Sequence, residues 1–167
     1  MNFEKEILQK VKRISKTHKG GEEFFDKLDG ELVNEASNEM IAHLLEMVPN
    51  KYVTVLSGGF GIMVASKIDS GELPHCPYIL LKGGIRSGKS PEIIRKTSYH
   101  GKRAIFLDDS IYGGATYQTI KQFLTTELDI KIEKCCVVYD GSPVKKKDIV
   151  SIFRYYDHFS STPNFSF

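Results

Sequence analysis

The sequence predicts a single α/β domain with a central, mainly parallel sheet flanked by helices. Apolar runs with the character of buried strands occupy residues 52–56, 78–81, 104–107 and 132–140. Helical or glycine-rich segments separate these runs, and strands that alternate with helices are typical of a parallel sheet. The chain has 167 residues, of which 41% are hydrophobic and 26% charged, as expected for one globular domain with its own core.

Two helical stretches precede the first strand. The first covers residues 2 to about 17, where apolar side chains recur at helical spacing: Phe3, Ile7, Leu8, Val11 and Ile14. Gly20-Gly21 is expected to end this helix. The second extends from Leu32 to Met47 and closes at Pro49-Asn50. We expect these helices to pack beside the sheet.

The bulk properties exclude several classes of protein. A net charge of +2 gives no global reason to bind nucleic acid or a membrane. No apolar run approaches the roughly 20 residues of a membrane-spanning helix, and the N-terminus lacks a signal-peptide core. The odd count of three cysteines, without metal-ligand spacing, predicts reduced thiols and a cytoplasmic location.

One segment matches the P-loop pattern of nucleotide triphosphatases, Gly83-x4-Gly88-Lys89-Ser90. A P-loop must open a helix that binds the triphosphate. The following segment supports two turns of helix at most, because Thr97 to Gly101 favour its termination. A mobile, basic, glycine-rich loop suits the segment better, and the P-loop triphosphatase remains a less favoured alternative.

A stronger signal lies at Ala104–Thr116, "AIFLDDSIYGGAT". Asp108 and Asp109 follow a buried strand, and ligands of parallel sheets bind beyond the carboxyl ends of strands. The glycine turn from Tyr112 to Thr116 then leads into a helix, so its backbone N–H groups form a phosphate cradle. Carboxylates beside such a cradle suit a ligand with both a phosphate and hydroxyl groups, as in a ribose 5-phosphate.

This segment resembles the motif by which type I phosphoribosyltransferases bind 5-phosphoribosyl 1-pyrophosphate (PRPP). The resemblance implies that Asp108 and Asp109 hold the ribose hydroxyls, with Asp109 among the catalytic residues. It also implies that the 5′-phosphate is bound by the turn residues Tyr112, Gly113, Gly114, Ala115 and Thr116. Mg²⁺ is the implied cofactor, held by Asp108 and Asp109 directly or through water.

The resemblance covers about residues 50 to 141. It implies a pyrophosphate site that includes the loop residues Ser57, Gly58 and Gly59, together with Lys82, Arg86 and Lys89. Residues 83–101 would then form a flexible catalytic loop in which Lys89 acts on the leaving group. The chain would be one phosphoribosyltransferase-like domain of N-terminal helices (1–49), core (about 50–141) and C-terminal hood or tail (about 142–167).

The implied activity is transfer of the 5-phosphoribosyl group from PRPP to a nitrogenous base, with release of pyrophosphate, by a homodimer. Three departures leave the base open. Tyr112 stands where 6-oxopurine enzymes carry an Asp, Gly113 replaces a hydroxyl residue of the phosphate loop, and Gly141 follows Asp140 where orotate enzymes carry an Arg. The departures at Tyr112 and Gly113 favour the main alternative, a non-catalytic sensor of PRPP or a nucleotide.

Overall fold

The computed structural model describes residues 2–18, 21–49, 51–83 and 89–159. The described helices are α1 (Phe3–Thr17), α2 (Gly21–Glu35), α3 (Asn38–Glu46), α4 (Gly58–Asp69) and α5 (Ala115–Leu128), followed by the short 3₁₀ helix η2 (Tyr155–Asp157). The strands are β1 (Val53–Ser57), β2 (Tyr78–Leu81), β3 (Ile93–Lys96), β4 (Arg103–Ile111), β5 (Lys131–Asp140) and β6 (Ile149–Arg154).

The strands form one six-stranded sheet in the order β3-β2-β1-β4-β5-β6. All neighbouring pairs are parallel except β2 and β3. The predicted α/β fold class, with its mainly parallel sheet flanked by helices, is therefore confirmed. No helix of the described ranges combines the length and apolar character needed to span a bilayer.

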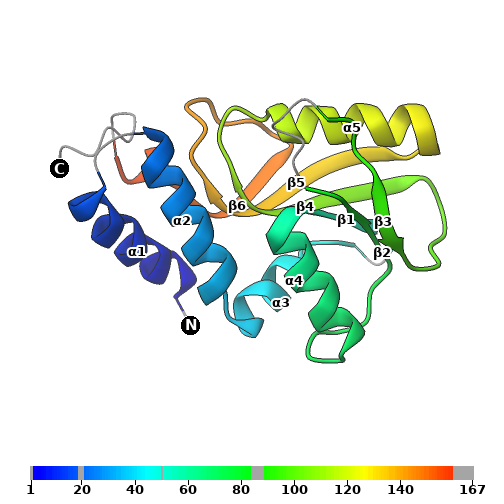
Figure 1. Ribbon diagram of the computed structural model, residues 1–167, viewed down its shortest axis with the longest axis horizontal. Helices are drawn as coiled ribbons and strands as arrows, with labels where there is room; N and C mark the ends of the chain where they lie inside the picture. Colours follow the sequence, from blue (N-terminus) through cyan, green and yellow to red (C-terminus); the bar gives the residue numbers. More distant parts are fainter. Residues whose placement is uncertain (1, 19–20, 50, 84–88, 160–167) are drawn as a thin grey trace.

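The helices cover the two faces of the sheet unequally (Figure 1). Side chains of α1 to α4 form one core layer with the sheet, including Ile7, Leu28, Met40 and Phe60. On the other face, α5 contributes Tyr117, Ile120 and Leu124 to a second layer that includes Phe106 and Val137. Burial of both faces explains why the central strands read as continuous apolar runs.

The N-terminal half contains one helix more than the sequence indicated. The predicted stretch from Leu32 to Met47 is divided between α2 and α3, because Ser37 caps α3 by accepting a hydrogen bond from the Met40 N–H at 3.1 Å. Gly21, which was expected to end the first helix, opens α2 instead.

Two strands lie where the sequence predicted other structure. Ile93–Lys96, within the predicted catalytic loop, forms the antiparallel edge strand β3 beside β2. A P-loop would require a helix after Ser90, so this strand argues against the triphosphatase alternative. Ile149–Arg154, which we assigned to a hood or tail, pairs with β5 as strand β6, since its β-branched and aromatic residues suit a sheet.

Candidate functional site

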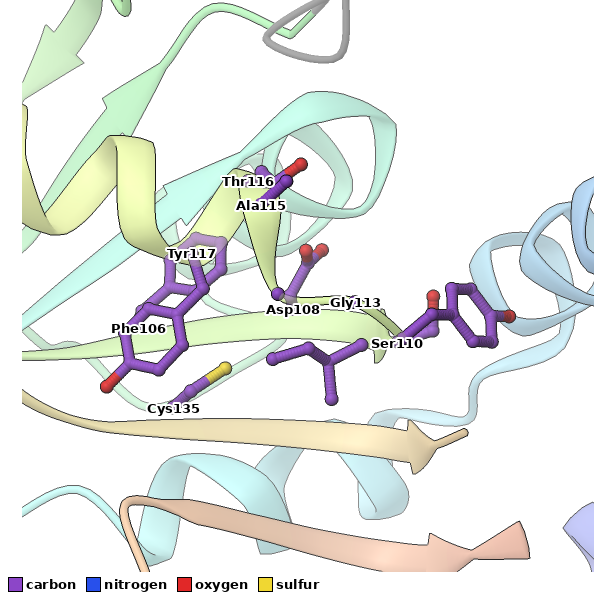
Figure 2. Close-up of a pocket in the computed structure, with 11 residues that line it drawn as sticks. Phe106, Asp108, Ser110, Gly113, Ala115, Thr116, Tyr117 and Cys135 are labelled. Atoms are coloured by element: carbon purple, nitrogen blue, oxygen red, sulfur yellow. The ribbon is translucent and has the colours of Figure 1, made fainter. Parts of the chain in front are cut away.

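The predicted acidic pair lies near the carboxyl end of a central strand. β4 continues past Leu107 to Ile111, so Asp108 and Asp109 belong to the strand rather than to the turn beyond it. Both side chains are partly buried. The Asp108 carboxylate points towards the first turn of α5, where Thr116 lies (Figure 2).

The glycine turn behind these acids leaves its amides available. Among the described residues, the backbone N–H groups of Tyr112, Gly113 and Gly114 have no hydrogen-bond acceptor. Gly114 adopts the left-handed conformation (φ 83°) that glycine tolerates best, and it immediately precedes α5. The first N–H groups of α5, including that of Thr116, have no acceptor within the helix. The turn therefore presents a row of donors suited to an anion.

The two carboxyl groups are held by their own backbone and affect one another. Asp108 Oδ1 accepts a hydrogen bond from the Asp109 N–H at 2.9 Å, and Asp109 Oδ1 accepts one from the Ser110 N–H at 2.9 Å. Burial, and then the neighbouring charge of Asp109, raise the pKa of Asp108 well above its ordinary value. Hydrogen-bond donors or a cation would relieve this concentration of negative charge.

Two cavities share Asp108 and Thr116 in their linings. One, of about 230 Å³, lies beneath the glycine turn and is lined by Asp108, Thr116 and apolar side chains such as Phe106 and Tyr117. The other, of about 250 Å³, is lined by the acidic pair, Thr116, Gly83 and α2, and by residues 57–59. The structure thus brings the predicted ribose and 5′-phosphate residues together with Ser57, Gly58 and Gly59.

Glycine allows the neighbouring turns to approach closely. A Cβ atom on Gly83 would lie 3.2 Å from the Gly58 Cα, and Gly58 has a positive φ of 66°. At Gly61, a Cβ atom would lie 3.0 Å from the Leu56 carbonyl carbon, so α4 packs directly on β1. These contacts fix residues 57–59 beside the end of β2.

The two described basic residues assigned to the pyrophosphate, Lys82 and Lys89, do not line the cavity of the acidic pair. Lys82 is exposed and follows β2, with its N–H bonded to the Glu92 carbonyl at 2.8 Å. Lys89 lines a separate cavity against α5, beside residues such as Thr119 and Phe123. Arg86 lies outside the described residues.

Two charged residues near the site were missed by sequence reasoning. Asp29 of α2 lines the cavity of the acidic pair and accepts hydrogen bonds from the Ser110 and Tyr112 hydroxyls at 2.7 and 2.9 Å. The Lys146 ammonium lies 4.0 Å from the position that a Cβ atom of Gly114 would occupy. An acid on an amphipathic helix and a lysine within a run of three look like solvated charges, so neither carried a usable signal.

The described residues contain no cluster of three or more His, Cys, Asp or Glu side chains that could hold a metal by themselves. Asp108 and Asp109 nevertheless supply the carboxylate oxygens that Mg²⁺ prefers. They fit an ion that is held mainly by substrate oxygens.

The arrangement of strands and helices matches solved structures. Orotate phosphoribosyltransferase of Mycobacterium tuberculosis H37Rv, solved in complex with PRPP, is similar over 93% of this chain and 90% of its own, with 11% identity and a TM-score of 0.54. The chain has the type I phosphoribosyltransferase fold. The fold that the sequence resemblance implied is therefore confirmed.

Other phosphoribosyltransferases also match the chain. The orotate enzyme of Aeropyrum pernix is 15% identical over 74% of each chain, with a TM-score of 0.48. A hypoxanthine phosphoribosyltransferase of Staphylococcus aureus is 14% identical over 77% of this chain and 76% of its own, with a TM-score of 0.43. No protein-family model and no curated protein sequence matches the chain.

Proposed function

We propose that the protein transfers a 5-phosphoribosyl group from PRPP to a nitrogenous base and releases pyrophosphate. The observation that carries this proposal is the juxtaposition of Asp108 and Asp109 with the available amides of the 112–116 turn. Carboxylates accept hydrogen bonds from a diol, whereas backbone N–H groups at a helix N-terminus bind a phosphate. A ribose 5-phosphate group satisfies both halves of the site.

The residues of this chain hold the reacting sugar in place. In the proposed complex, the turn from Tyr112 to Thr116 binds the 5′-phosphate, and the acids orient the ribose hydroxyls. Fixing the sugar at both ends presents its C1 atom to the acceptor, and such positioning supplies much of the rate acceleration in group transfer. The loss of a hydroxyl at Gly113 weakens the phosphate contact without removing the backbone donors.

The leaving pyrophosphate would lie at Ser57, Gly58 and Gly59, which line the same cavity as the acids. When bound with the substrate, Mg²⁺ would supply charge neutralisation at the pyrophosphate, with Asp108 and Asp109 as its protein contacts. Lys82 follows the strand beside this loop, and we assign Arg86 and Lys89 to the pyrophosphate on closure of the loop. Because Lys89 lines a cavity against α5, its participation requires that its side chain leaves this position.

The first test is PRPP binding by the double variant Asp108→Asn, Asp109→Asn. We expect binding measured by calorimetry to be lost while the circular dichroism spectrum is retained, because the amides cannot replace two carboxylates towards a diol and Mg²⁺. The exposed Asp26→Asn variant is the matched control. Undiminished binding of PRPP by the double variant would refute the assignment.

A sensor that binds PRPP without catalysis is the second candidate. Tyr112 favours it, because burial and the nearby Asp29 raise the pKa of its phenol well above 10.0 and so remove it as a base at neutral pH. Pyrophosphate release from PRPP with a panel of bases separates the two candidates. Turnover with any base supports the transferase, whereas tight PRPP binding with no turnover supports the sensor.

A further inference from the structure

Helix α2 forms one wall of the cavity that contains the acidic pair. Asp29 and Val33 of this helix line the cavity together with the residues assigned to ribose and pyrophosphate. Phe25 of the same helix packs on Tyr112, with the ring centroids 4.1 Å apart. Since Ser57–Gly59 and the acidic pair are assigned to parts of PRPP, α2 supplies lining residues of this cavity that have no assigned contact with PRPP.

The Asp29 carboxylate is held in a defined orientation. The Ser110 and Tyr112 hydroxyls both donate to Oδ1, at 2.7 and 2.9 Å. Tyr112 remains a donor at neutral pH, because burial raises the pKa of its phenol. Asp29 is thereby anchored to β4 and to the phosphate turn at once. An oriented carboxylate on the wall of a binding cavity is suited to recognise a hydrogen-bond donor of the ligand.

The charge of the cavity also restricts the acceptor. Its described lining residues include the carboxyl groups of Asp29, Asp108 and Asp109 and no Lys, Arg or His. Mg²⁺ bound with PRPP would offset the acidic pair, whereas Asp29 lies on the α2 wall. A carboxylate on the incoming base would be repelled by the charge of Asp29, whereas an N–H group of the base could donate a hydrogen bond to its carboxylate.

We propose that Asp29 determines acceptor specificity: it accepts a hydrogen bond from an N–H group of an uncharged nitrogen heterocycle and excludes bases that carry a carboxylate. This inference rests on the proposed function, because it assumes that the acceptor meets the sugar in this cavity. It assigns the role of base recognition to the N-terminal helices, rather than to residues after β5.

The test compares acceptors of the two kinds with wild-type protein and the Asp29→Asn variant. The uncharged bases with N–H groups are hypoxanthine, guanine, adenine and uracil, and the carboxylated bases are nicotinate and orotate, which keeps ring N–H groups beside its charge. Pyrophosphate release gives kcat/KM for each base. The asparagine oxygen can still accept from Ser110 and Tyr112, so the anchoring of α2 is preserved while the charge is removed.

We expect the wild type to prefer an N–H base over either carboxylated base by more than about tenfold, the worth of one charge-assisted hydrogen bond. Asp29→Asn should narrow this preference by about 10-fold and leave the KM for PRPP within about twofold. A merely structural role would lower turnover of all bases equally. Asp29→Glu, which keeps the charge, should retain the preference, and the exposed Asp26→Asn is the matched control on the same helix.

Binding provides a readout that does not need turnover. Inosine and orotidine 5′-monophosphate are titrated into both proteins, and the wild type should bind the inosine nucleotide at least about tenfold tighter. Equal affinities, a preference for the orotidine nucleotide, or an unchanged preference in Asp29→Asn would overturn the inference while the proposed function stands. If neither PRPP nor either nucleotide binds, the proposed function itself fails, and the inference with it.

Discussion

The ring of Tyr112 occupies the space that a side chain at position 141 would need. A Cβ atom on Gly141 would lie 2.6 Å from the Tyr112 Cδ1 atom, closer than non-bonded carbon atoms approach. The two departures from the orotate and purine enzymes, Tyr112 and Gly141, are therefore in contact, and the Tyr112 ring leaves room only for glycine at position 141. Arg154 of β6 lies 3.7 Å from Asp140, so that carboxyl group already has a basic neighbour.

We expect Gly141→Ala to destabilise the protein by about 1–3 kcal/mol, because a methyl group cannot enter this packed space without displacing the Tyr112 ring. The free energy of unfolding from urea titration measures the change. The two substitutions should not be additive: the double variant should be less destabilised than the sum of Tyr112→Ala and Gly141→Ala, with a coupling energy of about 0.5–3 kcal/mol. Gly30→Ala is the control, because no atom lies within 4 Å of its added Cβ and the site is an exposed helix position. Additive effects at positions 112 and 141 would contradict the packing argument.

Lys146 gives a second prediction, on phosphate binding. Its ammonium lies beside Gly114, at the turn assigned to the 5′-phosphate. We expect Lys146→Ala to weaken binding of ribose 5-phosphate by about 3- to 10-fold at low salt, with a smaller effect at high salt, because partly exposed charges are screened. Calorimetric titration at two salt concentrations measures it. Lys145→Ala, which removes an equally exposed neighbour, should change the affinity little. Equal losses in the two variants would show only a general effect of charge.

The local parts of the site could be predicted from sequence. The strand, the acidic pair Asp108-Asp109 and the turn at Gly113-Gly114 all lie within one short segment of the chain, so a local pattern identifies them together. The sheet order beyond them was predictable only in its parallel character. β3 was missed because Ile93–Lys96 is a four-residue edge strand with mostly exposed side chains, which lacks the apolar signature of the central strands.

The remaining parts of the site depend on contacts between distant residues. Asp29 accepts hydrogen bonds from Ser110 and Tyr112, which lie 81 and 83 residues further along the chain, and no local sequence pattern predicts such a pairing. The Gly141–Tyr112 contact likewise follows from the pairing of β4 with β5, in which Ile111 is level with Asp140. Sequence reasoning noted both departures but could not place them side by side.

The cysteines give a third prediction, on thiol reactivity. Burial raises the pKa of Cys136 to about 11 and the pKa of Cys135 well above its ordinary value. Cys76 is half-buried, and burial raises the pKa of its thiol too. Because the thiolate is the reactive form, we expect a disulfide reagent at pH 8 to modify Cys76 slowly and Cys135 and Cys136 only on unfolding. Mass spectrometry after timed labelling measures this, with protein in denaturant as the control. Rapid modification of Cys135 in the native protein would contradict the burial of β5.

The fourth prediction concerns the cost of holding Asp108 in the site. Its folded-state pKa is raised, chiefly by burial and then by the Asp109 charge, so the folded protein binds a proton more tightly than the unfolded chain does. Stability contributed by this group is therefore present below its unfolded pKa of about 4 and declines as pH rises from there through the folded value.

Asp108→Asn should remove the destabilisation caused by the ionised carboxylate, and it should also abolish PRPP binding. We expect the variant to melt higher than the wild type at pH 7, by about 2–4 °C for each kcal/mol gained, and to lose this advantage at about pH 3, below the unfolded pKa, where Asp108 is protonated in both states. Thermal unfolding at a series of pH values measures it, beside PRPP titration. Asp26→Asn, on an exposed surface, should follow the wild type. If Asp108→Asn and the wild type keep the same difference in melting temperature from about pH 3 to pH 8, burial and the Asp109 charge do not destabilise the ionised Asp108 carboxylate, and the acidic pair has no electrostatic need for a cation or a diol.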